Sequence, residues 1–279
     1  MGEYETIEYK GHTITTGFED DGSIFDPRDG DNLGTMNCSH GRYTFGDEQT
    51  SPDDMRVPCP TCSIFGDVGE VPVPVTFDSD DELDSSLLDG MGWTHCPTCD
   101  SAAEVADPVR WAVEVEGATV VLGLYLYDHS GITMSASTLY RDGERVNGGN
   151  PFTCRWDSGM VGIMYDTPKG LQTCFGKHER VEDRYVFTGE YLTSDGAKPD
   201  ADRIEQGLHA EVKVYDAYLT NDIMWYRVEG DLCDEAVGGF FPDETGGHDY
   251  MVKEAKAEVD ASIEREAKQS AMIERMMAL

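Results

Sequence analysis

Two short segments of the chain repeat one cysteine motif. The segment "PCPTC" covers Pro58–Cys62 and "HCPTC" covers His95–Cys99, so each presents two thiols separated by Pro and Thr. Such a turn directs two thiolates toward one point and leaves backbone amides free to donate to the sulfurs, which makes half of a tetrahedral zinc site. The two turns therefore predict a four-thiolate metal site made by Cys59, Cys62, Cys96 and Cys99.

The surroundings of the two cysteine pairs favour zinc over the alternatives. Residues 63–95 separate the pairs. This exceeds the roughly 15–20 residues usual in such sites, but the cost of closing a loop grows slowly with its length. Two disulfides are disfavoured in a reducing compartment, and polar, proline-rich surroundings do not bury four unlinked thiols, although both alternatives stay open. Four thiolates leave no open coordination position, so the zinc would be structural.

A second group of reactive side chains follows a hydrophobic strand. The segment "LYLYDHSGITMS" (Leu124–Ser135) contains Asp128 and His129, and "PFTCRWDSG" (Pro151–Gly159) contains Cys154 and Asp157. Together they could make a cysteine nucleophile with a histidine base and an orienting carboxylate. A buried thiol, a histidine at a strand end and an Asp-Ser-Gly turn explain the same residues without catalysis. No oxyanion loop, nucleophile elbow or phosphate-binding glycine loop accompanies them, so the sequence favours a protein that is not an enzyme, without excluding one.

Hydrophobic patterns predict the strands that would position these groups. Residues 5–15 alternate like an edge hairpin that turns at Lys10 and Gly11. Two strands are expected on either side of Glu116-Gly117, and two more later in the chain. These four strands cover residues 109–117, 118–127, 159–166 and 223–230.

Two helices are predicted from periodic apolar positions. The first covers residues 200–222, with Asp202 as its cap and Glu205 completing a capping box. Its buried face would be Ile204, Leu208, Val212, Tyr215 and Leu219. The second begins at about Asp249 and continues to the end of the chain. Its aligned apolar residues are Val252, Ala255, Val259, Ile263 and Ala267.

The predicted class is α+β, with a mixed or antiparallel sheet, a central helix and a long C-terminal helix. Composition becomes rich in Pro, Gly and acidic residues between residues 48 and 108. We therefore expect a discontinuous core domain over residues 1–47 and 109–248, an inserted zinc-ribbon-like module over 48–108, and an amphipathic C-terminal helix over 249–279.

Charge is the most unusual global property of the chain. It has 55 acidic and 21 basic residues, a net charge of −34. Acidic surfaces of this kind occur in DNA mimics and in halophilic proteins, and the scarcity of Lys favours the second interpretation. No cluster of basic residues is present, which argues against direct binding of nucleic acid. The longest apolar run is too short to cross a membrane and the N-terminus lacks an apolar leader, so a cytoplasmic location is expected.

Four segments of the chain resemble successive blocks of an uncharacterised family of tailed-phage and prophage proteins. They are "DPRDGDNLGTMNCSHGRYTFGD" (26–47), "LYLYDHSGITMS" (124–135), "FTCRWDSGMVGIMY" (152–165) and "EVKVYDAYLTNDIMWYRVEG" (211–230). The resemblance implies a viral or mobile-element origin. The acidic, lysine-poor composition makes a haloarchaeal host the first expectation and an actinobacterial phage the alternative. It places in the shared core Asn32, Gly34, His40, Asp128, His129, Cys154, Trp156, Asp157 and Gly159. The cysteine module and residues 136–150 depart from the family pattern as insertions.

Three functions are compatible with these observations. The leading one is a virus-encoded accessory protein that binds a host or viral protein, for instance as an inhibitor of a host defence system. The second is a hydrolase that uses Cys154 and His129, with Asp157 or Asp128 as the carboxylate. The third is a virion component. The sequence leaves the partner and the oligomeric state open.

Overall fold

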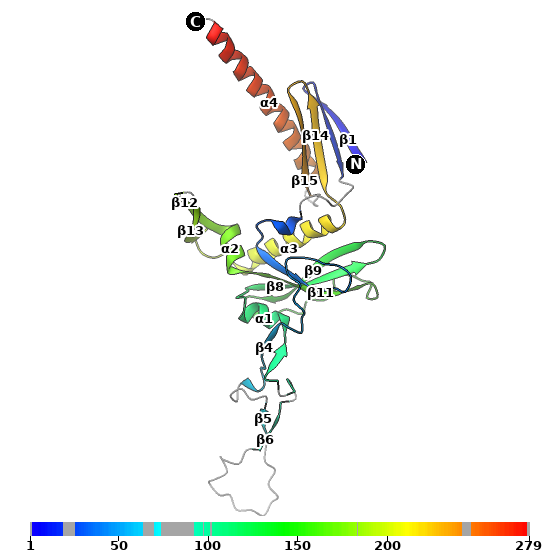
Figure 1. Ribbon diagram of the computed structural model, residues 1–279, viewed down its shortest axis with the longest axis vertical. Coiled ribbons are helices and arrows are strands. Elements are labelled where there is room, and N and C mark those ends of the chain that lie inside the picture. The colour runs from blue at the N-terminus through cyan, green and yellow to red at the C-terminus, as the bar shows by residue number, and fades with distance from the viewer. Residues whose placement is uncertain are drawn as a thin grey trace, which may run out of the picture.

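The computed structural model describes residues 2–18, 26–63, 70–73, 92–96, 98–100, 102–182, 184–241 and 247–277. The molecule is elongated, with three parts along one axis (Figure 1). A four-stranded sheet and the C-terminal helix lie at one end, a five-stranded sheet with shorter helices lies in the middle, and the cysteine segments lie at the other end. The pairs within the sheets are antiparallel, which confirms the predicted α+β class.

The central sheet has the order β10-β9-β8-β11-β3. Its strands are β3 (Gly34–Cys38), β8 (Val120–Asp128), β9 (Ile132–Arg141), β10 (Glu144–Arg145) and β11 (Ser158–Asp166). Strand β8 is buried on both faces: Leu122 and Leu124 belong to one hydrophobic cluster, whereas Val121 belongs to another. Because successive side chains of a strand point to opposite faces, this explains the continuous apolar run in the sequence. The strands predicted over 118–127 and 159–166 are confirmed by β8 and β11.

The strand predicted over residues 109–117 is wrong, because helix α1 (Pro108–Glu114) occupies this segment. Asp107 caps the helix by accepting a hydrogen bond from the backbone amide of Arg110 at 3.1 Å, and Pro108 at the first position suits a helix start. Val109 and Ala112, three residues apart, are the buried pair. The alternating valines favoured a strand, but capping and packing against the sheet outweighed this weak preference.

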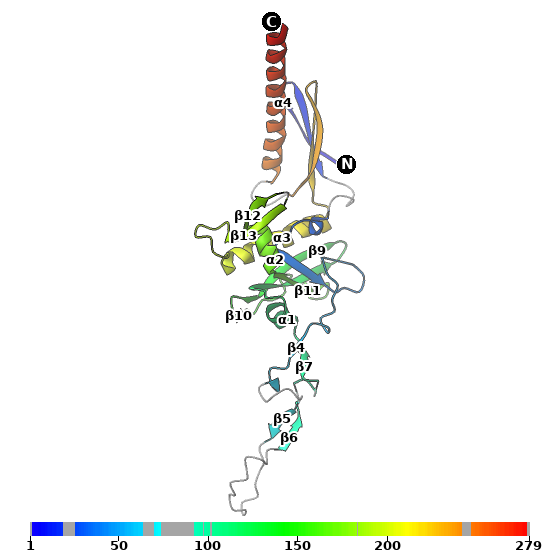
Figure 2. The same ribbon diagram turned by 60° about the vertical axis from the view of Figure 1, so that its left-hand side comes forward.

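The central helix predicted over residues 200–222 is confirmed as α3 (Ala201–Leu219), which covers the sheet face opposite α1 (Figure 2). Four of its predicted face residues are buried and Leu219 packs at the edge of the same cluster; the four are Ile204, Leu208, Val212 and Tyr215. The predicted cap is wrong by two residues. The side chain of Asp200 accepts from the amide of Arg203, whereas Asp202 pairs with Arg141.

A buried carboxylate lies at the end of strand β11. Asp166 is fully buried, and its Oδ1 accepts hydrogen bonds from the amides of Thr119 and Val120 at 2.8 and 2.7 Å. Its Oδ2 has no hydrogen-bond partner among the described residues. Burial raises the pKa of this carboxyl, although the two amides and Lys198 oppose the rise.

We expect the Asp166→Asn variant to gain stability relative to the native protein as the pH rises. A raised pKa in the folded state stabilises the fold below the unfolded value, near 3.8, and this contribution is lost as the pH rises through the folded value. Asparagine keeps the accepting oxygen and cannot ionise. Denaturant unfolding of both proteins between pH 4 and 8 measures the difference, and a difference independent of pH would contradict the prediction.

The second sheet joins the two ends of the sequence. Its order is β1-β2-β14-β15, formed by β1 (Gly2–Tyr9), β2 (His12–Phe18), β14 (Met224–Gly230) and β15 (Cys233–Phe240). The predicted hairpin is confirmed: Lys10 and Gly11 have φ angles of 51° and 81°, the left-handed pair that a tight two-residue hairpin turn requires. The strand predicted over 223–230 is confirmed by β14.

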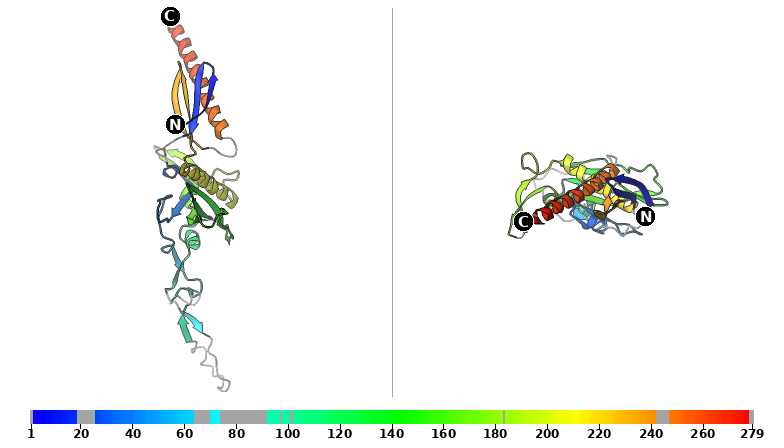
Figure 3. Two further views of the ribbon diagram at one scale, coloured as in Figure 1. Left: turned by 90° about the vertical axis from the view of Figure 1, so that its right-hand side faces the viewer. Right: turned by 90° about the horizontal axis from the view of Figure 1, so that it is seen from above.

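The predicted C-terminal helix is confirmed as α4 (Gly247–Met277), which lies against one face of this sheet (Figure 3). Met251, Ala255 and Val259 are fully buried there. Ala267, predicted on the same face, is exposed because the helix continues beyond the strands. Within the described residues, no helix is both long enough and apolar enough to cross a membrane.

Shorter elements complete the fold. A 3-10 turn, η1, covers Pro27–Asp29. Helix α2 (Pro168–Phe175) precedes a hairpin of β12 (Gly176–Val181) and β13 (Arg184–Tyr191). In the cysteine segment β4 (Arg56–Pro58) pairs with β7 (Glu104–Ala106), and β5 (Glu70–Val73) pairs with β6 (Gly92–His95). The predicted core thus contains two sheets with separate hydrophobic clusters, while the predicted domain boundaries stay a prediction.

Candidate metal centre

The structure brings the four cysteines of the two repeated motifs together. Cys59 and Cys62 follow strand β4, Cys96 follows β6, and Cys99 lies before β7. All four are buried, and their sulfur atoms lie within 4.8 Å of one another. The Sγ atoms of Cys59 and Cys96 are 3.8 Å apart, as are those of Cys62 and Cys99.

These distances fit a metal site and not disulfide bonds. A disulfide needs two sulfurs at about 2.05 Å. Four thiolates at about 2.3 Å from a central ion, arranged as a tetrahedron, have sulfur–sulfur edges of about 3.8 Å. The observed 3.8 Å equals such an edge. The four cysteines could therefore hold one metal ion, and the cluster is compatible with a zinc-ribbon-like module.

Backbone amides prepare one thiol of each motif for ionisation. Burial opposes a charge on Cys59, but hydrogen bonds from the amides of Cys62 and Thr61 outweigh burial and lower its pKa to about 6. The corresponding amides of Cys99 and Thr98 lower the pKa of Cys96 in the same way. Burial and the neighbouring thiols raise the pKa of Cys62 to about 12. Ionising a second thiol in this cluster without a cation therefore costs free energy, as expected for a metal site.

The two motifs face each other with matching contacts, and the module contacts helix α1. The hydroxyl oxygens of Thr61 and Thr98, which occupy equivalent positions, are 2.9 Å apart. Arg110 of helix α1 donates to the carbonyl oxygen of Pro58 at 3.1 Å. Four thiolates around one ion would leave no coordination position for a substrate.

The second predicted group also comes together, at the end of strands β8 and β11. The carboxylate of Asp157 lies between the other two groups: its Oδ2 is 3.4 Å from the sulfur of Cys154 and 3.4 Å from Nδ1 of His129. Asp128 forms an ion pair with Arg42 instead. His40 stacks on Tyr43 beside Arg42, so it approaches this end of the sheet without joining the three groups.

The order of these groups differs from that of a cysteine hydrolase. There the imidazole contacts the sulfur and the carboxylate orients the imidazole. Here the carboxylate contacts the sulfur, and no described hydrogen bond joins Cys154 to His129. His129 is 65% exposed and Trp156 is 96% exposed, so these two neighbours of the thiol are open to solvent. Catalysis by these residues stays a prediction.

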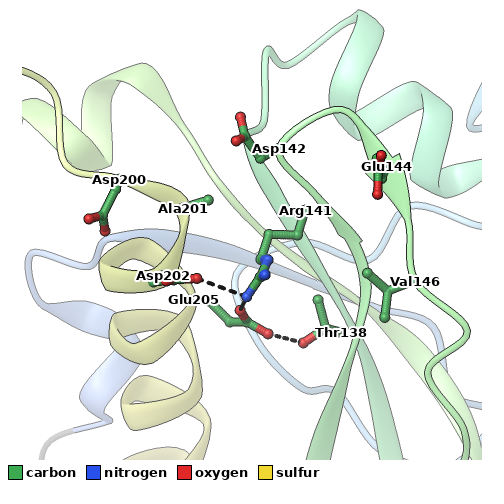
Figure 4. A pocket seen from close by; sticks show the side chains of 9 residues that line it. All are labelled: Thr138, Arg141, Asp142, Glu144, Val146, Asp200, Ala201, Asp202 and Glu205. Atoms are coloured by element: carbon green, nitrogen blue, oxygen red, sulfur yellow. Dashed lines mark hydrogen bonds and ion pairs between the residues drawn. The ribbon is translucent and has the colours of Figure 1, made fainter.

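Sequence reasoning missed an acidic hollow between the β9–β10 hairpin and the start of helix α3 (Figure 4). Its volume is about 700 Å³. The charged side chains that line it are Arg141, Asp142, Glu144, Asp200, Asp202 and Glu205. Arg141 pairs with Asp202 at 2.8 Å and with Glu205 at 3.0 Å. The acidic start of the helix is visible in the sequence, but residues 136–150 were interpreted only as an insertion relative to the family pattern, so the facing wall of the hollow was not foreseen.

In the comparisons with known proteins, no family model, no curated protein and no solved structure matched this chain.

Proposed function

We propose that the four-cysteine site binds zinc and that the zinc is structural. All four ligands are thiolates at tetrahedral spacing, which suits a borderline-soft ion without a geometric preference of its own. The hydrophobic cluster of the module consists, among the described residues, of the four cysteines and the partly buried Val105. A segment with so little apolar packing needs the ion in order to fold.

We propose further that the protein is an acidic accessory protein of a virus or mobile element that acts by binding another protein. The acidic hollow of Figure 4 is the observation that carries this proposal. The resemblance of four segments to phage proteins supports the origin. A host defence complex that binds nucleic acid would offer the basic surface required, and inhibition of such a complex is the specific form of the proposal.

The charges of the hollow indicate the chemistry of the partner. Five carboxylates line it against one guanidinium, and that guanidinium is already paired with two of them. Among the described residues, Asp142 and Glu144 form no ion pair. A surface rich in Lys or Arg would therefore gain charge complementarity here, which contributes mainly to specificity and to the rate of association.

We expect neutralisation of the hollow to reduce partner capture at least tenfold. The test compares the tagged native protein with the triple variant Asp142→Asn, Glu144→Gln, Asp202→Asn in lysates of host and infected cells, with mass spectrometry of the bound proteins. A control variant removes equal charge from the exposed end of α4: Glu264→Gln, Glu266→Gln, Glu274→Gln. Equal capture by both variants would contradict the role of the hollow, and the absence of any stoichiometric partner would contradict the proposed binding function.

Hydrolysis by Cys154 remains the second candidate function, favoured by the contacts that Asp157 makes with both Cys154 and His129. The thiol would have to transfer its proton to the carboxylate of Asp157, and His129 would orient that carboxylate. Turnover of a thioester probe that is lost in Cys154→Ser would support it.

A further inference from the structure

The loop between strands β10 and β11 (residues 146–157) carries the most exposed large hydrophobic side chain of the described chain. Trp156 is 96% exposed, and the next in order within the described ranges, Tyr185, is 73% exposed. A single exposed apolar residue is common on protein surfaces. The surroundings of Trp156 therefore decide whether it marks a binding surface.

Hydrogen bonds and ring packing hold the β10–β11 loop in one conformation. Asn150 accepts a hydrogen bond from the amide of Phe152 at 2.9 Å and donates one to the hydroxyl of Ser158 at 2.9 Å. Ser158 donates in turn to the carbonyl oxygen of Cys154. The ring of Phe152 packs on that of Tyr127 in β8, with centroids 5.6 Å apart. The exposed indole thus belongs to an ordered loop, so a ligand would lose little affinity to ordering of the protein.

A hollow of about 630 Å³ opens at the same loop. Its one charged lining residue is Arg155, which directly precedes Trp156 in the chain. The other lining residues offer amide, hydroxyl and aromatic groups: Gly149, Asn150, Pro151, Phe152, Thr153 and Ser158. Arg155 is exposed, and it makes no hydrogen bond or ion pair with any part of the chain that the structure describes. Its guanidinium donors are therefore available to a ligand.

Two other cationic side chains near this loop already have acidic partners. Arg42 pairs with Asp128, and Nδ1 of His129 lies 3.4 Å from the carboxylate of Asp157. Arg155 is thus the cation that can still pair with an anion here. A guanidinium binds a carboxylate through two parallel hydrogen bonds, so a carboxylate is the group that matches it best.

The net charge of −34 limits how much negative charge the ligand can carry. At physiological ionic strength, charges are screened over about 8 Å. One carboxylate held at Arg155 would be shielded from more distant acidic groups. A polyanion such as nucleic acid would extend over the acidic surface and be repelled. These charges favour a ligand that is mostly neutral and carries one carboxylate.

We propose that the β10–β11 loop binds an oligosaccharide that carries a single carboxylate. One sugar ring would stack its C–H face on the indole of Trp156, and the carboxylate would pair with Arg155. The hydroxyl and amide groups of the hollow suit sugar hydroxyls, whereas a peptide anchor needs a tightly packed, desolvated pocket. The hollow shares no lining residue with the acidic hollow of Figure 4, so this site is independent of the proposed protein-binding function.

NMR titration of the full-length protein with matched sugars tests the proposal. Cellobiouronic acid and sialyllactose each carry one carboxylate, and cellobiose and lactose are their neutral counterparts. The acidic sugars should shift one of the four indole N–H signals, the signal that is lost in Trp156→Ala. They should bind roughly tenfold more tightly than the neutral sugars, because they add a charge-assisted hydrogen-bonded pair. Arg155→Gln should abolish this difference, and Trp156→Ala should weaken the binding of both acidic sugars.

A matched control variant changes the same kinds of residue elsewhere on the surface. The double variant Arg184→Gln, Tyr185→Ala removes an adjacent arginine and aromatic ring from strand β13, and it should bind the acidic sugars like the native protein. No saturable shift of the Trp156 signal in the native protein, or equal affinity for acidic and neutral sugars, would overturn the proposal. Tighter binding of a short glutamate peptide than of either acidic sugar, lost in Arg155→Gln, would also overturn it, because the loop would then recognise a protein.

Discussion

The Cys59→Ser variant is expected to lose its ion and the folded structure of the cysteine module, while both sheets remain folded. The free energy at stake is on the order of 10 kcal/mol, the binding energy of structural zinc sites. The loss should be this large because the four cysteines and Val105 make up the hydrophobic cluster of the described part of the module. Three remaining thiols would leave the ion weakly held and would leave buried sulfurs without a charge partner.

Hydrogen exchange and limited proteolysis measure this effect region by region. Amides of residues 56–62 and 98–106 should exchange freely in Cys59→Ser and in the chelator-treated native protein. Amides of β8 and α3 should keep their protection, because the central sheet has hydrophobic clusters of its own on both faces. Cys174→Ser is the control, since its thiol is exposed and belongs to helix α2, outside the cysteine module. Retained protection of the module after complete removal of the metal would contradict a structural ion.

The contrast between the four-cysteine site and the acidic hollow shows what could be predicted from the sequence. The four-cysteine site was foreseen because each Cys-Pro-Thr-Cys turn is a local unit whose geometry follows from its residues. The acidic hollow was not foreseen, because it depends on how the hairpin of β9 and β10 lies against the start of α3. Nothing local to Arg141 indicates that its partners are Asp202 and Glu205.

The same division between local sequence signals and tertiary packing applies to the secondary structure. Helix α3 and the turn at Lys10-Gly11 were predicted because their signals, apolar periodicity and a glycine in a tight turn, are local. Helix α1 was missed because its valines fit either state, and burial of Val109 and Ala112 against the sheet decided between them. Capping also required the structure, since Asp200 and Asp202 were both suitable acidic residues.

The Arg28→Ala variant is expected to lose about 3–5 kcal/mol of unfolding free energy, the usual cost of removing one partner from a buried ion pair. The side chain of Arg28 is 4% exposed. Its guanidinium donates to both oxygens of Asp47, at 2.6 and 3.1 Å, to Glu211 at 3.0 Å, and to a backbone carbonyl at 2.6 Å. Without it, the half-buried carboxylates of Asp47 and Glu211 would face each other with no cation.

A matched control variant separates the effect of burial on unfolding free energy from the effect of ion pairing alone. Arg141 also contacts two carboxylates, but its side chain is 46% exposed, so Arg141→Ala should cost no more than about 1 kcal/mol. Arg28→Lys should fall between the two, because lysine keeps the charge but lacks the planar fork that reaches Asp47 and Glu211 together. Denaturant unfolding of the three variants measures all of these differences. Removal of Arg28 should cost more unfolding free energy than removal of Arg141, because Arg28 is buried and its contacts join η1, β3 and α3. Equal losses of unfolding free energy in Arg28→Ala and Arg141→Ala would contradict this role.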